Sequence, residues 1–362
     1  MVTEAPGARG SRTVKAGVIH GIRDVRVEDR RLADPGPLDV VVRMTAVTIC
    51  GSDLHYYRHA VSGTFAIQAP FVLGHEGAGV VERVGDDVTS VKRGDAVAIN
   101  PGRACGLCRW CRSGRPNLCK RMRYMGSAGS TPHVDGLLVE FATVTEQQCF
   151  AVPRTLKPIE VAMIEPLAVA IHAARRAGYL FGKCVLIVGS GPVGLLLAQV
   201  VAMSGATVVI SDVNAARRDT ARTLGVGTVV DGLALELDEH LARLDADGFD
   251  VVFEATGASA AVAEAIPRLV RGGVWVQVGN LPKDVLHFSG AMLMVNEVDI
   301  RGSFRFLDEF DAAVSLMSSG RVRTDMITTH VFPFAELREA FAFAEQGGVP
   351  KVGVTFEPDT TH

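Results

Sequence analysis

The sequence predicts an α/β protein with two parts, one rich in β-strands and one built on a doubly wound parallel sheet. Up to about residue 160, short valine-containing runs are broken by Gly, Pro and Asp, as in DVVVRMTAV and GDAVAIN, a texture typical of antiparallel strands. Beyond that point, strand candidates alternate with segments of helix length, which indicates a parallel sheet. The four strand candidates are CVLIV, TVVIS, DVVFEA and GVWVQVG. A chain of 362 residues also exceeds the size of one hydrophobic core.

Charge and apolar content narrow the class of protein. The net charge of −3 argues against a dominant attraction to nucleic acid or to anionic membranes. Residues 184–211 carry no charge, a length that could span a bilayer as one helix. Their pattern of β-rich run, Gly/Pro turn, apolar run and second β-rich run instead predicts strand, turn, helix and strand. The odd number of cysteines and the lack of a signal-like N-terminal segment favour the cytoplasm.

A dinucleotide-binding motif follows the first strand of the parallel sheet. Gly189, Gly191 and Gly194 form G-x-G-x-x-G, which allows a tight turn, a close backbone approach to a pyrophosphate, and packing of helix on strand. Asp212 follows the next strand, where a carboxylate accepts hydrogen bonds from adenosine ribose hydroxyls and repels a 2′-phosphate. NAD is therefore favoured over NADP, although Arg217 or Arg218 leaves NADP open.

Four cysteines lie within fifteen residues as C-x2-C-x2-C-x7-C, the pattern of a closed tetrahedral zinc site. An iron–sulfur cluster, a redox pair and buried thiols are the alternatives. The four are Cys105, Cys108, Cys111 and Cys119. No acidic residue occurs from Ala96 to Val134, whereas seven cations do. This basic segment indicates either a nucleic-acid-binding zinc ribbon or, as we favour, cations that offset the charge of a zinc–thiolate unit.

A second set of metal-ligand residue types comprises Cys50, His75 and Glu76. Three protein ligands leave one zinc position open for water or substrate, which is typical of a catalytic site. Asp53 could orient His75, and two further neighbours could move a proton. These neighbours are Ser52 and His55.

Taken in order, these motifs resemble the zinc-dependent medium-chain alcohol and polyol dehydrogenases. The resemblance rests on Cys50-Gly-Ser-Asp53, Gly74-His75-Glu76, the four-cysteine segment and the glycine motif, and it covers residues 15–357. The stretches CGSDLHYY, MIEPLAVAIHAA, GGVWVQVG and RGSFRF resemble the sorbitol dehydrogenase branch in particular.

The resemblance implies a GroES-like catalytic domain (1–160 and 301–362, with a structural zinc lobe at about 101–123) and a Rossmann NAD-binding domain (161–300). It implies two zinc ions per chain, one held by the four cysteines and one catalytic ion held by Cys50, His75 and Glu76. Glu165 is expected to approach the catalytic ion directly or through water. Ser52 is expected to receive the alcohol proton and His55 to relay it. The implied coenzyme-binding residues are Gly189, Gly191, Pro192, Val193, Gly194, Asp212, Arg217 and Val278.

The implied reaction is oxidation of a secondary alcohol of a polyol or aldonate, with L-idonate to 5-ketogluconate as the specific prediction. Sorbitol, xylitol and L-threonine are alternative substrates, and a non-catalytic zinc- or nucleic-acid-binding protein is the alternative from another class. The predicted substrate residues are Tyr56, Arg305 and Phe306. Phe306 stands where polyol dehydrogenases commonly have Tyr, and Val61 where they often have a basic residue. The resemblance implies a dimer or tetramer with a small-molecule substrate, without nucleic-acid or membrane partners.

Overall fold

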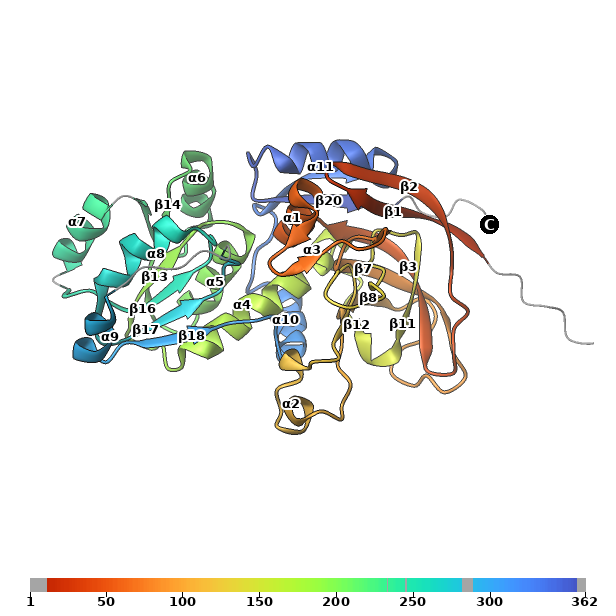
Figure 1. Ribbon diagram of the computed structural model, residues 1–362, viewed down its shortest axis with the longest axis horizontal. Helices are drawn as coiled ribbons and strands as arrows, with labels where there is room; N and C mark the ends of the chain where they lie inside the picture. Colours follow the sequence, from red (N-terminus) through yellow and green to blue (C-terminus); the bar gives the residue numbers. More distant parts are fainter. Residues whose placement is uncertain (1–11, 233, 245, 282–288, 357–362) are drawn as a thin grey trace, which may run out of the picture.

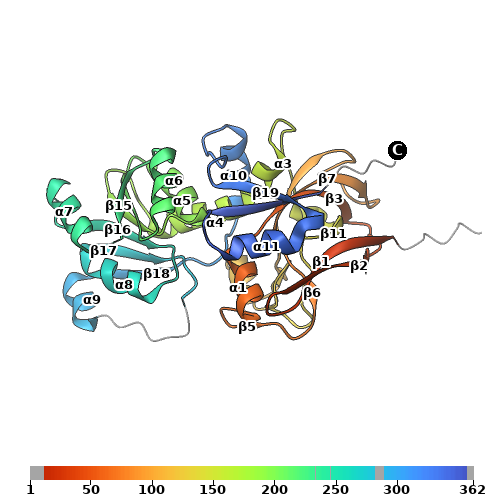
Figure 2. The same ribbon diagram turned by 90° about the horizontal axis from the view of Figure 1, so that it is seen from above.

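The computed structural model describes residues 12–232, 234–244, 246–281 and 289–356. Its two largest sheets lie side by side, and α4 (Ile164–Ala177) and α10 (Glu309–Ser318) lie between them (Figure 1). The view from above shows the same arrangement (Figure 2). The predicted combination of a β-rich part and a parallel-sheet part is confirmed.

The first of these sheets is parallel throughout, with strand order β15-β14-β13-β16-β17-β18. Its strands are β13 (Cys184–Val188), β14 (Thr207–Asp212), β15 (Thr228–Asp231), β16 (Phe249–Glu254), β17 (Leu269–Gln277) and β18 (Asp299–Gly302). The helices of this part are α5 (Pro192–Ala202), α6 (Ala215–Leu224), α7 (Ala234–Leu244), α8 (Ser259–Ala265) and α9 (Gly290–Asn296), with a 3-10 turn at Ile266–Arg268.

The uncharged segment 184–211 forms β13, α5 and β14, as its pattern predicts. Val185, Leu186 and Ile187 are completely buried because the strand lies inside the sheet and is covered on both faces. Among the described residues, no helix has the length and apolar character needed to cross a membrane.

The second large sheet has seven strands in the order β12-β8-β7-β3-β20-β19, and β11 also pairs with β3. Its strands are β3 (Asp39–Thr48), β7 (Glu76–Val84), β8 (Ala96–Ile99), β11 (Phe141–Thr145), β12 (Cys149–Ala151), β19 (Thr328–Pro333) and β20 (Lys351–Thr355). The last two strands come from the end of the chain, and β20 pairs antiparallel with β3. The N-terminal and C-terminal segments therefore share one sheet.

Smaller elements complete the β-rich part. They are β1 (Thr13–Gly21), β2 (Asp24–Arg31), β4 (Val61–Ser62), β5 (Phe65–Ala66), β6 (Phe71–Val72), β9 (Gly102–Arg103), β10 (Arg123–Tyr124), α1 (Gly51–His59), α2 (Arg109–Arg112), α3 (Pro158–Ala162) and α11 (Leu337–Glu345), with 3-10 turns at Pro116–Leu118, Glu146–Gln148 and Phe334–Glu336. The loop that carries α2 projects from the body of the molecule (Figure 1).

A buried polar contact joins α4 to α10. The Oε1 atom of Glu309 lies 3.0 Å from Nδ1 of His172 and 3.1 Å from a guanidinium nitrogen of Arg175. The Glu309 side chain is fully buried. Burial alone would raise its pKa, but hydrogen bonds from His172 and from the Leu307 N–H lower the pKa of Glu309 to about 2. The carboxylate therefore stays ionised and holds the two helices together.

We expect this carboxylate to make stability depend on pH. Because the pKa of Glu309 is lower in the folded chain than its ordinary value of 4.5, the stabilisation is complete above pH 4.5 and is lost as pH falls towards 2. Glu309→Gln should lower the free energy of unfolding at pH 7 by about 1 to 3 kcal/mol.

Melting temperatures between pH 7 and pH 3 test this expectation. The difference between wild type and Glu309→Gln should narrow as the solution becomes more acidic. Asp311→Asn, on the same helix, serves as the matched control and should melt like wild type. If the difference in melting temperature between wild type and Glu309→Gln stayed constant down to pH 3, the role assigned to the Glu309 carboxylate would be contradicted.

Candidate active site and metal centres

The three predicted catalytic zinc ligands come together at the ends of two paired strands. Cys50 is the N-cap residue of α1 and lies two residues after the end of β3, whereas His75 directly precedes β7 and Glu76 is its first residue. The register pairs Thr48 with Glu76. One ligand atom from each of the three residues lies within 4.8 Å of the others. A thiolate, an imidazole and a carboxylate at this spacing fit a zinc ion that keeps an open position.

Asp53 lies behind His75, as the sequence predicts for an orienting acceptor. Its Oδ1 atom is 3.6 Å from Nδ1 of His75, and its Oδ2 atom accepts a hydrogen bond from the Cys50 N–H at 2.9 Å. Asp53 Oδ1 and His75 Nδ1 are both buried and have no hydrogen-bond partner among the described residues. A small closure of this gap would let the carboxylate fix the imidazole tautomer when the other ring nitrogen binds a metal.

Sequence reasoning missed Lys351, which forms a buried ion pair with Glu76. The Lys351 ammonium lies 2.8 and 2.7 Å from the two Glu76 oxygens, and the exposed fractions of the two side chains are 3% and 2%. The hydroxyl of Thr48 also donates to Glu76. Burial would lower the pKa of Lys351, but Glu76 and Cys50 raise it above its usual value. The available signal was a lysine that opens the otherwise apolar strand KVGVTF.

The buried charges around this centre favour a divalent cation. Three carboxyl groups, those of Asp53, Glu76 and Glu165, are each no more than 5% exposed. Lys351 pairs with Glu76, and burial raises the pKa of Asp53 and of Glu165. Uncompensated buried charges cost several kcal/mol each, so a dication among the ligands would offset the remaining carboxylates and the Cys50 thiolate. The residues therefore fit the predicted metal.

Glu165 lies in the first turn of α4 and accepts a hydrogen bond from the Tyr124 hydroxyl at 2.6 Å. Burial raises the pKa of Glu165 to about 7. Burial and the neighbouring Glu165 also raise the pKa of Tyr124 well above 10. The Tyr124 ring centroid is 5.9 Å from that of His75. Tyr124, which sequence reasoning missed, thus connects Glu165 with the predicted ligands.

The two predicted proton-transfer residues lie on α1. Ser52 is half-buried in the first turn, and His55 is exposed one turn later. Residues three apart lie on the same helix face, so the pair can lead from the buried centre towards solvent. Partial burial of the ring, together with His59 and Arg58, lowers the pKa of His55, and the neutral imidazole can therefore accept a proton at neutral pH.

The four cysteines of the predicted structural site also come together. They are Cys105, Cys108, Cys111 and Cys119, all free thiols whose sulfur atoms form one group of candidate metal ligands. The sulfurs of Cys108 and Cys111 are 3.5 Å apart. Backbone N–H groups of Leu107 and Cys108, followed by contributions from Cys119 and Arg121, lower the pKa of Cys105 to about 6. The Arg121 contact supports the charge-offset interpretation of the basic segment.

The glycine motif has the geometry that a dinucleotide site needs. Gly189 has φ of 102°, and a Cβ on Gly194 would lie 1.9 Å from the Gly189 carbonyl oxygen. Gly191 is the N-cap residue of α5, and nothing lies within 4 Å of a Cβ placed there. Pro192 and Val193 open the helix. The free space and the helix N-terminus suit a pyrophosphate.

Asp212 ends β14 beside this loop. Its Oδ2 atom accepts hydrogen bonds from the Ser190 N–H and hydroxyl at 2.8 and 3.0 Å, and its Oδ1 atom accepts one from the Asn214 N–H at 2.8 Å. Arg218 forms an ion pair with Asp231 at 3.1 Å. The Arg217 Nε atom is buried and has no hydrogen-bond partner among the described residues.

Val278 directly follows β17, and its N–H donates to the Glu254 carbonyl at 2.9 Å. Glu254 and Val278 therefore lie at the same edge of the parallel sheet as Gly189, the edge at which dinucleotides bind in such sheets.

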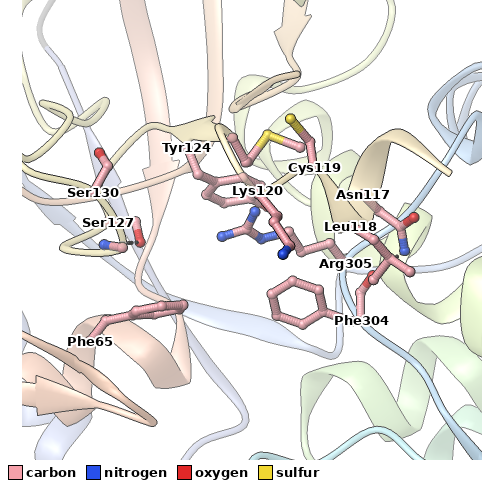
Figure 3. Close-up of a pocket in the computed structure, with 12 residues that line it drawn as sticks. Phe65, Asn117, Leu118, Cys119, Lys120, Tyr124, Ser127, Ser130, Phe304 and Arg305 are labelled. Carbon is pink, nitrogen blue, oxygen red and sulfur yellow. Dashed lines mark hydrogen bonds between the residues drawn. The ribbon is translucent and has the colours of Figure 1, made fainter. Parts of the chain in front are cut away.

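The predicted substrate residues lie in different surroundings. Arg305 lines an open pocket of about 270 Å³, and its guanidinium lies 4.0 Å from the Tyr124 ring centroid (Figure 3). Tyr56 is buried, and its hydroxyl accepts a hydrogen bond from the Ala128 N–H at 3.1 Å. Phe306 packs against Phe310 in the core, whereas Phe304 lines the pocket. Arg305 is thus the predicted substrate residue that the structure brings to the pocket.

Comparison with known proteins identifies the class. Residues 36–154 match the alcohol dehydrogenase GroES-like domain, and residues 192–319 match the zinc-binding dehydrogenase family. These matches define an enzyme of the alcohol dehydrogenase type that binds zinc.

Similar individual proteins identify the family to which the chain belongs. Sorbitol dehydrogenase of Gallus gallus is 36% identical, over 95% of this chain and 96% of that protein. The solved structure of L-idonate 5-dehydrogenase from Escherichia coli K-12 is 36% identical with a TM-score of 0.90, over 96% and 99% of the two chains. A short chain alcohol dehydrogenase from E. coli CFT073, complexed with NADH, is 26% identical with a TM-score of 0.86, over 96% and 100%. The chain belongs to the polyol dehydrogenase family.

We expect the Lys351–Glu76 pair to couple stability to zinc. Lys351→Met leaves Glu76 as an uncompensated buried charge and should destabilise the metal-free chain by about 3 to 5 kcal/mol. A bound zinc ion should restore part of this loss because it offers Glu76 a new positive partner.

Melting temperatures in zinc and in EDTA measure this coupling. Zinc should raise the melting temperature of Lys351→Met by more than it raises that of wild type. Because the four-cysteine site is the same in both proteins, its contribution cancels in that comparison. Lys351→Arg, which keeps the charge, is the control. An equal zinc increment in all three proteins would count against the coupling.

Proposed function

We propose that this enzyme oxidises a secondary alcohol of a polyol or aldonate and transfers a hydride to NAD, and that its substrate is L-idonate, which becomes 5-ketogluconate. The observation that carries the proposal is the open ligand set of Cys50, His75 and Glu76 next to a pocket that contains Arg305. The similarity to L-idonate 5-dehydrogenase supports the aldonate.

The proposed domains follow the sheets. Residues 1–160 and 301–362 would form the catalytic domain and residues 161–300 the coenzyme domain, with the two joined through α4 and α10. The position of β19 and β20 beside β3 supports the inclusion of the C-terminal segment in the catalytic domain. β18 (Asp299–Gly302) crosses the proposed second boundary.

The predicted residues would act on the substrate one after another. Zinc held by Cys50, His75 and Glu76 would supply a Lewis acid that lowers the pKa of the substrate hydroxyl. Ser52 would accept the hydroxyl proton, and His55 would pass it to solvent. Glu165, anchored by Tyr124, would hold a water molecule or approach the open metal position. Asp53 would keep His75 in one orientation.

The coenzyme would lie across the parallel sheet. The loop of Gly189 and Gly191 would bind its pyrophosphate, and Asp212 its adenosine ribose. Bound NAD would supply the hydride acceptor. The NADH complex of a related dehydrogenase supports this assignment. The Arg218–Asp231 ion pair also supports NAD, since it occupies one of the two arginines that could bind a 2′-phosphate.

A neutral polyol is the second candidate substrate. The similarity to a sorbitol dehydrogenase, at the same 36% identity, favours it. The two candidates differ in one feature, the negative charge of the aldonate, which makes them experimentally separable.

We expect a substrate panel to rank L-idonate with NAD first in kcat/KM. The panel contains L-idonate, 5-ketogluconate for the reverse reaction, sorbitol, xylitol and threonine, each with NAD and NADP. Highest kcat/KM with sorbitol or xylitol would replace the aldonate by the neutral polyol. A zinc-replete enzyme that oxidises none of them and binds DNA with a steep salt dependence would refute the proposal.

We expect Asp212→Asn to weaken the preference for NAD. The amide keeps the size of the side chain but removes the charge that repels a 2′-phosphate, so kcat/KM with NADP should rise relative to NAD by about tenfold. Arg217→Met should have the opposite effect if Arg217 binds the phosphate. An unchanged NAD to NADP ratio in Asp212→Asn would remove the ribose assignment.

A further inference from the structure

The pocket beside Tyr124 contains two cations and no carboxylate among the described residues that line it. The cations are Arg305 and Lys120. The other lining residues are neutral: Phe65, Asn117, Leu118, Cys119, Met122, Tyr124, Ser127, Gly129, Ser130 and Phe304. Figure 3 shows the Arg305 and Lys120 side chains pointing into the same space between Tyr124, Phe304 and Phe65.

Neither cation has a carboxylate partner in the part of the chain that the structure describes. The contacts of Arg305 are with the rings of Tyr124 at 4.0 Å and Phe304 at 4.7 Å. Burial lowers the pKa of Arg305, whereas the nearby Tyr124 and Glu165 act in the opposite direction, because a desolvated guanidinium is unfavourable unless an anion compensates it. Two like charges in one pocket repel each other, and a bound anion would relieve both costs.

The relative placement of the two cations is built into the fold. Lys120 belongs to the four-cysteine lobe and directly follows Cys119, whereas Arg305 follows β18. Asn117 is buried, and its amide donates to the Phe304 carbonyl at 2.9 Å. This bond ties the lobe to the backbone next to Arg305, which has a φ of 57°. The lobe and the Phe304–Arg305 segment therefore form a defined pair of walls.

The pocket is adjacent to the predicted metal centre. Tyr124 lines the pocket, contacts Arg305, donates to Glu165 and lies 5.9 Å from the His75 ring. One aromatic ring thus separates the Arg305 guanidinium from a predicted zinc ligand. A substrate whose hydroxyl reached the metal could extend its other end towards the cations.

We propose that Lys120 and Arg305 together bind the anionic end of an acidic sugar alcohol, a carboxylate or a phosphate monoester, and that Lys120 determines the selectivity for acidic over neutral substrates. This inference rests on the proposed function and adds a residue of the four-cysteine lobe to the substrate site. Arginine and lysine are the side chains that form charge-assisted hydrogen bonds with such groups.

The test compares substrates that differ in charge. L-idonate and L-iditol share the reacting alcohol and differ at C1, which is a carboxylate in one and a hydroxymethyl group in the other. Sorbitol 6-phosphate tests the phosphate alternative. Lys120→Met removes the charge and keeps most of the stem, Lys120→Arg keeps the charge, and Lys92→Met is a control at an exposed lysine outside the pocket.

We expect Lys120→Met to lower kcat/KM for L-idonate by about ten- to hundredfold, mainly through KM, and for L-iditol by no more than about threefold. Lys120→Arg should recover most of the loss, and Lys92→Met should behave like wild type. If sorbitol 6-phosphate shows the larger loss, the pair binds a phosphate. Equal losses for charged and neutral substrates, or no loss for either acid, would overturn the proposal.

Binding without turnover separates this inference from the proposed function. Calorimetry of the zinc-loaded enzyme with 5-ketogluconate, and with neutral L-sorbose for comparison, needs no oxidation step. If no alcohol is oxidised but 5-ketogluconate binding weakens in Lys120→Met, the proposed reaction fails and the anion site stands. If L-idonate is oxidised and its kcat/KM and the binding of 5-ketogluconate do not depend on Lys120, the reaction stands and the anion site fails.

Discussion

The buried ion pair between Lys351 and Glu76 joins the end of the chain to the predicted catalytic centre. It depends on the register of three strands, in which β3 pairs with β7 on one side and β20 on the other. The Ile49 N–H donates to the Val352 carbonyl at 2.9 Å, next to Cys50. Because a slip of one residue would turn every side chain to the opposite face of a strand, the centre forms only when the C-terminal strand is in place.

Several buried polar groups surround the predicted metal centre in addition to the Lys351–Glu76 ion pair. Lys351 compensates Glu76 from behind, Asp53 lies behind His75, and Glu165 is held by Tyr124 on the side of the pocket. Each of these groups is buried, so it interacts with its neighbours in a medium of low dielectric constant, where electrostatic interactions are stronger than in water. The protein thus gathers carboxyl groups where a metal is expected and cationic side chains where an acidic substrate would extend. A polar core of this kind costs stability, and function is the physical reason to keep it.

The sequence allowed prediction of features whose residues are near one another along the chain. The glycine motif, the four cysteines and the strand–helix alternation are of this kind, because tight turns, metal ligation and packing periodicity act over short separations. Lys351, Tyr124 and Lys120 could not be found in this way. Lys351 meets Glu76 across 275 residues, and no spacing rule specifies which antiparallel strand will lie beside another. Phe306 illustrates the same limit, since the left-handed backbone at Arg305 turns Phe304 to the pocket and Phe306 to the core.

Three consecutive residues of the four-cysteine lobe, Cys119, Lys120 and Arg121, have different surroundings. Arg121 contacts Cys105, whose thiolate it stabilises, whereas Lys120 points into the pocket and Cys119 belongs to both the cysteine cluster and the pocket wall. A metal ion held by the four sulfurs would fix the backbone on which Lys120 stands, and the Asn117–Phe304 bond fixes that backbone against the segment of Arg305. The basic composition of the lobe is therefore more than compensation for thiolate charge. A loop made rigid by a metal would hold the flexible lysine stem at the edge of the pocket, so that anion binding would not have to order the backbone as well.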